Sequence, residues 1–339
     1  MRVLILLTSF SICSLVAAQT DVTGIVLNAH SMVYHKAESK TYIFGGATEK
    51  EVTNQLLSID GEKLNKVATR DAPPGRTFGS MVYDEKDESI FLFGGSKVLF
   101  GKKTDVTNLL NDTWVFKQGK WARLTTAHAP KPRAEAAIAY DTERNRMVLF
   151  GGYSIEGTDY VKLGDTWEFY DNDWHPVATE GPSARNGAAL SFDPSLKTLV
   201  LFGGSTSDKS YGPATGETWT WNGQQWSKME MVQPANIFNS AMAYQLPEQR
   251  LLRFGGWNGK ARTDETWYFE NNSWTQLQTS HQPTARNHSQ MIYDSENQQL
   301  LLFGGHNGKL VFGDLWIFKE NEWKQLIHTA PKKRLKNRH

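Results

Sequence analysis

The chain has 339 residues, and its 37 basic and 36 acidic side chains leave a formal net charge of +1. This balance lacks the strongly basic surface that non-specific nucleic-acid binding needs, so no nucleic-acid partner is predicted. A hydrophobic fraction of 39% with 22% charged residues is typical of a soluble globular protein and excludes a disordered or membrane-embedded one.

Residues 1–18 have the pattern of a signal peptide. A positive Arg2 precedes an apolar stretch from Val3 to Val16, and the small residues of Val16-Ala17-Ala18 predict cleavage before Gln19. The stretch is too short to span a membrane, so no membrane span is predicted and the protein is expected to be secreted or periplasmic. The single cysteine, Cys13, leaves with this leader, so the exported chain has no disulfide.

A Phe-Gly-Gly triplet then recurs at intervals of 49–57 residues, which indicates six internal repeats. The triplets begin at Phe44, Phe93, Phe150, Phe202, Phe254 and Phe303.

Each repeat predicts four strands. An alternating strand such as Ala137–Tyr140 leads through a polar turn to a strand that is apolar throughout, such as Met147–Phe150, and that ends at the two glycines. A variable loop and an Asp-Thr-Trp element follow, and a second tryptophan comes seven residues after the first, as in Trp167 and Trp174. The fixed spacing is that of a hairpin whose tryptophans pack against the next repeat.

These features resemble the kelch motif over nearly all of the exported chain. The resemblance implies a six-bladed kelch-type β-propeller over residues 19–330, all-β, with four antiparallel strands per blade and a fold related to the central domain of galactose oxidase. The sequence leaves ring closure open. Residues 323–327 can complete blade 6, and residues 22–27 can add an N-terminal strand as a clasp.

Arginines recur before the first strand of four blades and would lie around one mouth of the central channel: Arg76, Arg133, Arg185 and Arg286. They are candidates for an anion-binding ring, because guanidinium groups suit carboxylate and phosphate. The alternative is that each one holds its own loop. Arg253 stands where the other blades have Ile or Leu, so it either reaches the channel or pairs with a neighbouring blade.

The residue after each Gly-Gly pair varies and should lie at the same mouth. Tyr153, Trp257 and His306 are candidates for stacking on a sugar or planar group, with loop packing as the alternative. The loops of blades 2, 3 and 4 are the longest, which makes their face the expected binding face. The blade 2 loop places Val98-Leu99-Phe100 beside two lysines, a pattern suited either to a protein partner or to packing on its neighbour.

Spacing patterns for metal sites and catalytic nucleophiles are absent, so neither a metal nor a cofactor is predicted. Galactose oxidase needs a Tyr–Cys crosslink that the exported chain cannot make, and the Glu-x-x-x-Asp-x-x-x-His pattern of plant kelch specifier proteins does not occur. Acid–base sites assembled from carboxylates on separate blades would escape such patterns.

Residues 331–339 carry five basic side chains and are predicted to form a flexible tail, either simply solvated or weakly tethered to an anionic surface. The leading functional hypothesis is a monomeric, non-catalytic scaffold that binds a protein or glycan through the long loops of blades 2–4. The alternative is a carbohydrate-active enzyme, epimerase-like or lyase-like, with its site at the channel mouth. An enzyme should gather carboxylates and a histidine there, and a binding scaffold should show an aromatic or apolar patch on the loops of blades 2–4. A structural envelope component should show neither of these two features.

Overall fold

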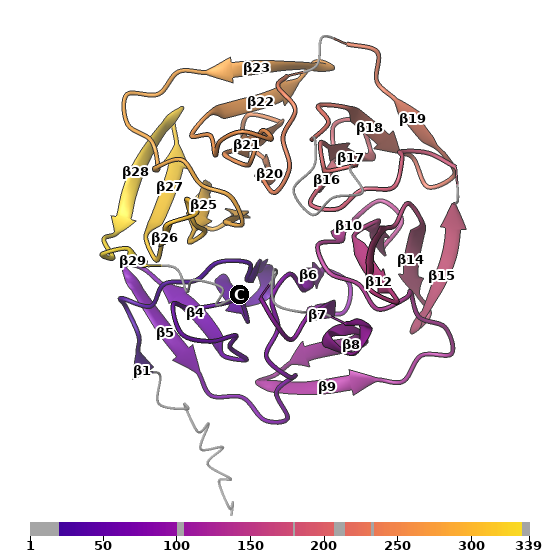
Figure 1. Ribbon diagram of the computed structural model, residues 1–339. Helices are drawn as coiled ribbons and strands as arrows, with labels where there is room; N and C mark the ends of the chain where they lie inside the picture. The colour runs from indigo at the N-terminus through magenta and orange to yellow at the C-terminus, as the bar shows by residue number, and fades with distance from the viewer. Residues whose placement is uncertain (1–19, 100–104, 179, 207–213, 232–233, 334–339) are drawn as a thin grey trace, which may run out of the picture.

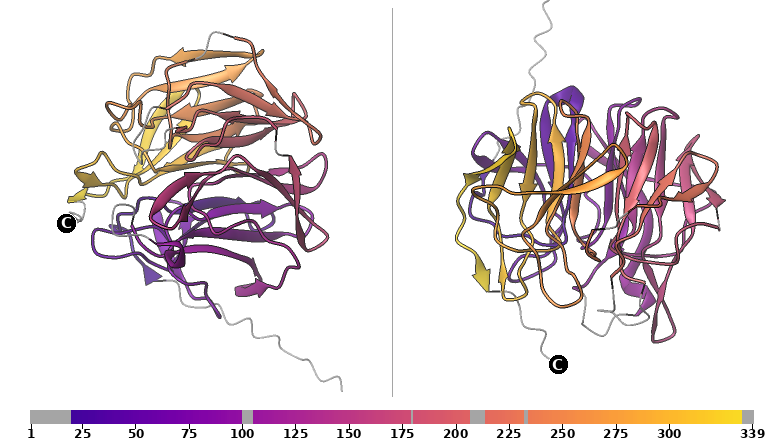
Figure 2. Two further views of the ribbon diagram at one scale, coloured as in Figure 1. Left: turned by 45° about the vertical axis from the view of Figure 1, so that its right-hand side comes forward. Right: turned by 90° about the horizontal axis from the view of Figure 1, so that it is seen from above.

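Each repeat folds as one four-stranded antiparallel sheet, and the six sheets surround a common axis (Figure 1). The computed structural model describes residues 20–99, 105–178, 180–206, 214–231 and 234–333. The predicted six-bladed, all-β propeller is therefore confirmed, and the side views in Figure 2 show the blades packed around the axis.

The strands follow one another within each blade from the channel outward. Blades 1 to 3 consist of β2 (Ser31–His35), β3 (Lys40–Phe44), β4 (Leu56–Asp60) and β5 (Lys63–Val67); β6 (Ser80–Asp84), β7 (Ser89–Ser96), β8 (Leu109–Lys117) and β9 (Lys120–Leu124); and β10 (Ala137–Asp141), β11 (Arg146–Phe150), β14 (Thr166–Tyr170) and β15 (Asp173–Ala178). Blades 4 to 6 consist of β16 (Ala189–Asp193), β17 (Thr198–Phe202), β18 (Thr218–Trp221) and β19 (Trp226–Lys228); β20 (Ala241–Gln245), β21 (Arg250–Phe254), β22 (Thr266–Glu270) and β23 (Ser273–Leu277); and β24 (Gln290–Asp294), β25 (Gln299–Phe303), β27 (Leu315–Lys319) and β28 (Glu322–Ile327).

Several short elements are present in addition to the four strands of each blade. They are the outer strand β1 (Thr20–Asp21), the hairpin of β12 (Tyr153–Glu156) and β13 (Asp159–Lys162), the pair β26 (Leu310–Val311) and β29 (Lys332–Lys333), and the 3₁₀ turns η1 (Lys36–Glu38) and η2 (Val106–Asn108). Strand β29 lies at the start of the segment expected to be a flexible tail, and residues 334–339 lie outside the described part of the chain. None of the described helical turns is long and apolar enough to cross a membrane.

The two glycines of each repeat end a strand that is buried on both faces. In blade 3, Met147 to Phe150 are at most 2% exposed, and Gly151 and Gly152 both have positive φ. A Cβ on Gly151 would lie 2.6 Å from the Arg185 carbonyl oxygen of the next blade. Glycine is therefore needed here for backbone conformation and for close approach of two blades.

The second tryptophan of each pair packs between neighbouring blades, but on the preceding repeat and not on the next one as the spacing predicted. Trp174 is 1% exposed, its ring centre lies 5.0 Å from that of Phe93 in blade 2, and its Nε1 donates to Thr113 Oγ1 at 2.9 Å. The first tryptophan of each pair donates its Nε1 to the carboxylate two residues before it, as Trp167 does to Asp165. The indoles thus combine apolar burial with a satisfied polar group.

Ring closure uses both ends of the chain without exchanging a strand between blades. Strand β28 completes blade 6, while β1 pairs with β5 as a fifth strand of blade 1. Across the gap, Gly305 N donates to Leu27 O at 2.8 Å, the same contact that Gly152 N makes with Arg185 O at 2.9 Å. The closing junction therefore repeats the main-chain geometry of the others.

Two faces follow from this topology. The loops after Gly-Gly pair with the connections that enter each first strand, as Tyr153 does with Ala134 and Ser205 with Asn186. We call this side the loop face. The opposite side carries the tight turns between first and second strands, and we call it the turn face.

Candidate functional site

A closed ring of main-chain hydrogen bonds surrounds the channel at the loop face. Each member lies two residues before a first strand, and its N–H donates to the carbonyl of the preceding member at 2.7–3.3 Å. All six have φ between 53° and 64°. The members are Ala29, Phe78, Glu135, Gly187, Asn239 and His288. One left-handed residue per blade thus brings six chain segments around the axis, and we call this set the inner ring.

The side chains of four inner-ring residues meet over the channel. The rings of Phe78 and His288 lie 5.0 Å apart, and the Asn239 amide is hydrogen-bonded to His288 Nε2 at 2.6 Å. Glu135 Oε2 accepts from Asn239 Nδ2 at 3.5 Å, and Glu135 Oε1 lies 3.7 Å from His288 Nε2. Residues from blades 2, 3, 5 and 6 therefore cover the channel with a mainly polar plug.

Glu135 is the acidic residue of this plug. Its side chain is 6% exposed, and burial raises the pKa of its carboxyl group, although Lys162 and the amides of Asn186 and Asn239 act in the opposite direction. Lys162 bonds Asn186 Oδ1, and Asn186 Nδ2 donates to Glu135. A buried carboxyl group beside an imidazole is a pair of groups that general acid–base catalysis uses.

His306 extends the plug outward. Its Nδ1 accepts from Gly308 N at 2.9 Å, so in the neutral ring the proton is on Nε2, which lies 2.9 Å from His288 Nδ1. His288 thus has His306 Nε2 on its Nδ1 side, and the Asn239 amide and Glu135 on its Nε2 side. The carboxyl group and the two imidazoles therefore form one continuous chain from blade 3 to the loop of blade 6.

An extra hairpin stands beside the plug on blade 3. Strands β12 and β13 pair from Tyr153–Lys162 to Glu156–Asp159, outside the blade sheet. Tyr153 and Ile155 pack with Phe78 and with Leu109 of the blade 2 loop. The hairpin thereby fixes the position of Lys162 at its end.

The four predicted arginines are buried and bonded within their own blades. Each side chain is at most 1% exposed, donates to the first glycine of its own Gly-Gly pair and forms an ion pair of 2.6–2.7 Å. The pairs are Arg76–Asp112, Arg133–Asp165, Arg185–Glu217 and Arg286–Asp314. This geometry matches the alternative in which each arginine holds its own loop, and it leaves no guanidinium facing an incoming anion.

Arg253 supplies the same group to blade 5 from another strand. The residue at the usual arginine position there is Ile237, while Arg253 Nη1 donates to Gly255 O at 2.9 Å and Nη2 lies 3.9 Å from Glu265. Burial lowers its pKa to about 10, against the effect of Glu265. Arg253 therefore pairs inside the blade and does not reach the channel.

The three predicted stacking residues lie at the loop face but differ from the expectation in accessibility. Tyr153 and His306 are each 1% exposed, because Tyr153 packs against Tyr160 and His306 joins the plug. Trp257 is partly exposed, with the Arg262 guanidinium 4.6 Å from its ring centre. In the blade 2 loop Leu99 is buried, and Phe100, Lys102 and Lys103 lie outside the described residues.

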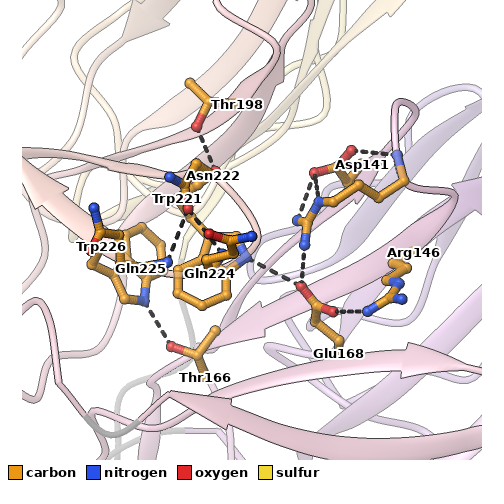
Figure 3. A network of polar contacts seen from close by, with 11 residues as sticks. Asp141, Arg146, Thr166, Glu168, Thr198, Trp221, Asn222, Gln224, Gln225 and Trp226 are labelled. Carbon is orange, nitrogen blue, oxygen red and sulfur yellow. Dashed lines mark hydrogen bonds and ion pairs between the residues drawn. The ribbon is translucent and has the colours of Figure 1, made fainter.

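A second charged cluster lies between blades 3 and 4, away from the plug (Figure 3). Glu168 is 1% exposed and accepts from Arg144 and Arg146 at 2.6 and 2.7 Å, and from Trp221 Nε1 at 3.2 Å. Arg144 also bonds Asp141 at 2.7 Å. The two carboxylates of the cluster neutralise its two guanidinium groups. The cluster therefore stabilises the junction between blades 3 and 4.

Sequence reasoning missed Glu135, Asn186, Asn239 and His288. The position of Glu135, Asn239 and His288 holds a different residue in every blade, so no shared motif marks it, whereas the position of Asn186 is also asparagine in blades 1 and 6, as Asn28 and Asn287. Aligning the six blades on their first strands and reading the residue two places before each would have brought three of them into one set.

Comparison with known proteins agrees with this architecture. The model of the KLHDC2/KLHL20/DRC7 Kelch-repeats domain matches twice, over residues 7–181 and 165–339. The chain therefore belongs to the kelch-repeat β-propeller family.

Similarity to individual proteins covers the chain less completely. The chain is 32% identical to tRNA wybutosine-synthesizing protein 4 of Aspergillus fumigatus over 136 residues, which is 38% of the chain and 12% of that protein. It is 31% identical to dynein regulatory complex subunit 7 of Chlamydomonas reinhardtii over 35% of the chain and 10% of that protein. Identity to N-(sulfonatooxy)prop-2-enimidothioate sulfolyase of Thlaspi arvense is 26% over 64% of the chain and 52% of that protein.

Proposed function

We propose that this protein is an exported interaction scaffold that binds a protein partner on the loop face. The proposed surface consists of the β12–β13 hairpin of blade 3 and the adjoining loop of blade 2. The kelch fold is compatible with a scaffold role, and the β12–β13 hairpin is the observation that carries the choice of face. It is an added element on one blade, packed against the loop of blade 2, with Val106 of that loop 43% exposed. Rigid loops on a propeller are suited to recognition. The buried rings of Tyr153 and His306 favour a protein over a glycan as the ligand.

A matched pair of surface variants tests the choice of face. Val106→Glu changes the loop face and Leu196→Glu changes the turn face, and the two native side chains are 43% and 41% exposed. With residues 19–339 immobilised, we expect a partner from the surrounding extracellular fluid to be lost with Val106→Glu and kept with Leu196→Glu. The reverse pattern would move binding to the turn face, and retention by both variants would contradict a role for the blade 2 loop.

The enzyme alternative has its own supporting observation, since Glu135 and His288 gather a carboxyl group and an imidazole at the channel mouth. If the site turns over a sugar, Glu135→Gln should abolish turnover and leave the melting temperature within a few degrees, because a glutamine oxygen still accepts from Asn186 and Asn239. A panel of glycans screened for both binding and conversion, with Trp257→Ala beside it, measures this. Unchanged turnover in Glu135→Gln would exclude Glu135 as the acid or base.

A further inference from the structure

The turn-face mouth of the channel is an open funnel of about 570 Å³ whose wall is part apolar and part polar. Its lining includes the polar or charged turn residues Lys36, Glu85, Thr142 and Ser295, together with the aromatic residues at the fourth position of each first strand, which are Tyr34, Tyr83, Tyr140, Phe192, Tyr244 and Tyr293. Concave apolar sites of roughly 300–1,000 Å³ are the usual size for small-molecule ligands.

The hydroxyl groups of three of these tyrosines are bonded to neighbouring blades. Tyr34 Oη accepts from Glu296 N of blade 6 at 3.3 Å, and Tyr83 Oη accepts from Ala37 N of blade 1 at 3.3 Å. Tyr244 Oη is bonded to Ser195 of blade 4 at 2.6 Å. With their polar ends engaged between blades, the tyrosines contribute mainly ring surface to the funnel.

Methionine is concentrated at the narrow end of the funnel. The second position of the first strand is Met in four blades and Ile138 or Leu190 in the other two, although the whole chain has only eight methionines. The four are Met32, Met81, Met242 and Met291. Methionine side chains are flexible and polarisable, so they adapt to apolar ligands of different shape.

Beyond this narrow part lies a small polar chamber of about 150 Å³ that ends at the inner ring. Met32, Met81, Ile138, Leu190, Met242 and Gln290 line both the funnel and the chamber. Gln290 is the only one of these with a polar side chain, and other blades have Ser or Ala at its position in the repeat. No hydrogen bond of its amide group is found within the described residues, and the side chain is only half-buried.

We propose that the funnel binds a small amphiphilic molecule. Its hydrocarbon body lies against the methionines and the aromatic rings, and a hydroxyl or amide end reaches the Gln290 amide at the entrance of the polar chamber. The inner ring and its plug limit how deep the ligand enters. The aromatic and methionine surface beside the Gln290 amide suits a ligand with an apolar body and one polar end.

A fluorescence titration with 1-N-phenylnaphthylamine, which emits strongly in apolar surroundings, tests the funnel in the intact protein. We expect saturable binding of one probe per chain. Met242→Trp, which fills the narrow end, should weaken it at least tenfold, and Leu246→Glu at the 53% exposed rim should weaken it severalfold with no risk to the core. Val106→Glu on the loop face is the control and should leave the probe's Kd unchanged.

Displacement of the probe by 1-octanol tests the polar end. Gln290→Leu removes one hydrogen bond at similar volume, so octanol should displace the probe about five- to tenfold less effectively while the probe's own Kd stays within twofold. Probe binding that is absent, or that survives both Met242→Trp and Leu246→Glu, overturns the funnel as a site. Equal octanol displacement in the wild type and in Gln290→Leu overturns the amphiphile.

Discussion

The junction that closes the ring and the junctions between consecutive blades meet the same packing requirement with different chemistry. Where blade 6 adjoins blade 5, Arg286 accepts a main-chain hydrogen bond from Gly256 of blade 5, and its side chain forms a buried ion pair with Asp314 of its own blade. Between blades 6 and 1, Leu27 occupies the arginine position and packs with Leu64, Leu315 and Phe303. Blade 1 also has Gln55 where the other blades have the carboxylate, so both charges are missing together.

Tryptophan and threonine vary between junctions in the same paired way. Trp174, Trp226, Trp274 and Trp323 each donate to a threonine of the preceding blade. The closing junction has Leu64 and Leu315 in place of both partners. At the junction of blades 1 and 2, Leu56 replaces the threonine alone, and Trp121 Nε1 is left buried without a partner. Repeats therefore tolerate change best when both members of a contact change.

Breaking one arginine pair should have the largest effect. Arg286→Leu leaves Asp314 buried and unpaired, and we expect it to lower the free energy of unfolding by about 3–5 kcal/mol. The double variant Arg286→Leu/Asp314→Gln copies blade 1 and should recover more than half of the loss. Chemical denaturation measures both, and a double variant no more stable than the single one would contradict the paired-loss interpretation.

Acid should weaken the closing junction before the others. His30 in blade 1 is 1% exposed and lies 5.4 Å from the Phe303 ring of blade 6, and burial lowers its pKa to about 3. Because the unfolded histidine binds a proton near pH 6.5 and the folded one does not, stability should fall by about 1.4 kcal/mol per pH unit between pH 6.5 and 3. His30→Leu should remove this slope above pH 5.

The arginine junctions should respond to acid only at lower pH. Burial raises the pKa of Glu217, but Lys228 and Arg185 together lower it to about 2. The ionised Glu217 carboxylate therefore makes its full contribution to the free energy of unfolding above about pH 4.5, and this contribution is lost as the pH falls toward 2. Thermal melts of Glu217→Gln and His30→Leu across pH 2–7 separate the two ranges, and identical curves for the two variants would refute the distinction.

The smallest expected effect is a difference in unfolding free energy between substitutions of two almost equally buried tryptophans. Trp174→Phe removes a hydrogen bond, whereas Trp121→Phe removes a donor that has no partner. We expect Trp174→Phe to cost about 0.5–1.5 kcal/mol more. Equal losses, measured by urea unfolding under one set of conditions, would mean that the indole hydrogen bonds contribute nothing net.

The repeats made the fold predictable, because the Gly-Gly and tryptophan spacings are imposed by contacts that recur in nearly every blade. They did not predict the plug. Its residues share a backbone conformation rather than a side-chain type, and three of the six inner-ring members, Ala29, Phe78 and Glu135, are residue types that rarely adopt positive φ. The role of Arg253 was partly predictable. Blade 5 departs from the repeat twice, with Ile237 at the arginine position and Arg253 at an apolar position, and the second departure compensates for the first.

Ring closure without strand exchange has a mechanical consequence. Both described ends of the chain lie at one junction, where β1 and β28 belong to different blades. Among the described residues, side-chain packing, single hydrogen bonds and the Lys332–Glu49 ion pair cross this gap. A force that pulls on the two termini acts on that junction first. Once it opens, each blade is one unbroken stretch of chain held by its neighbour, so extension should proceed in steps of about fifty residues, blade by blade from the ends.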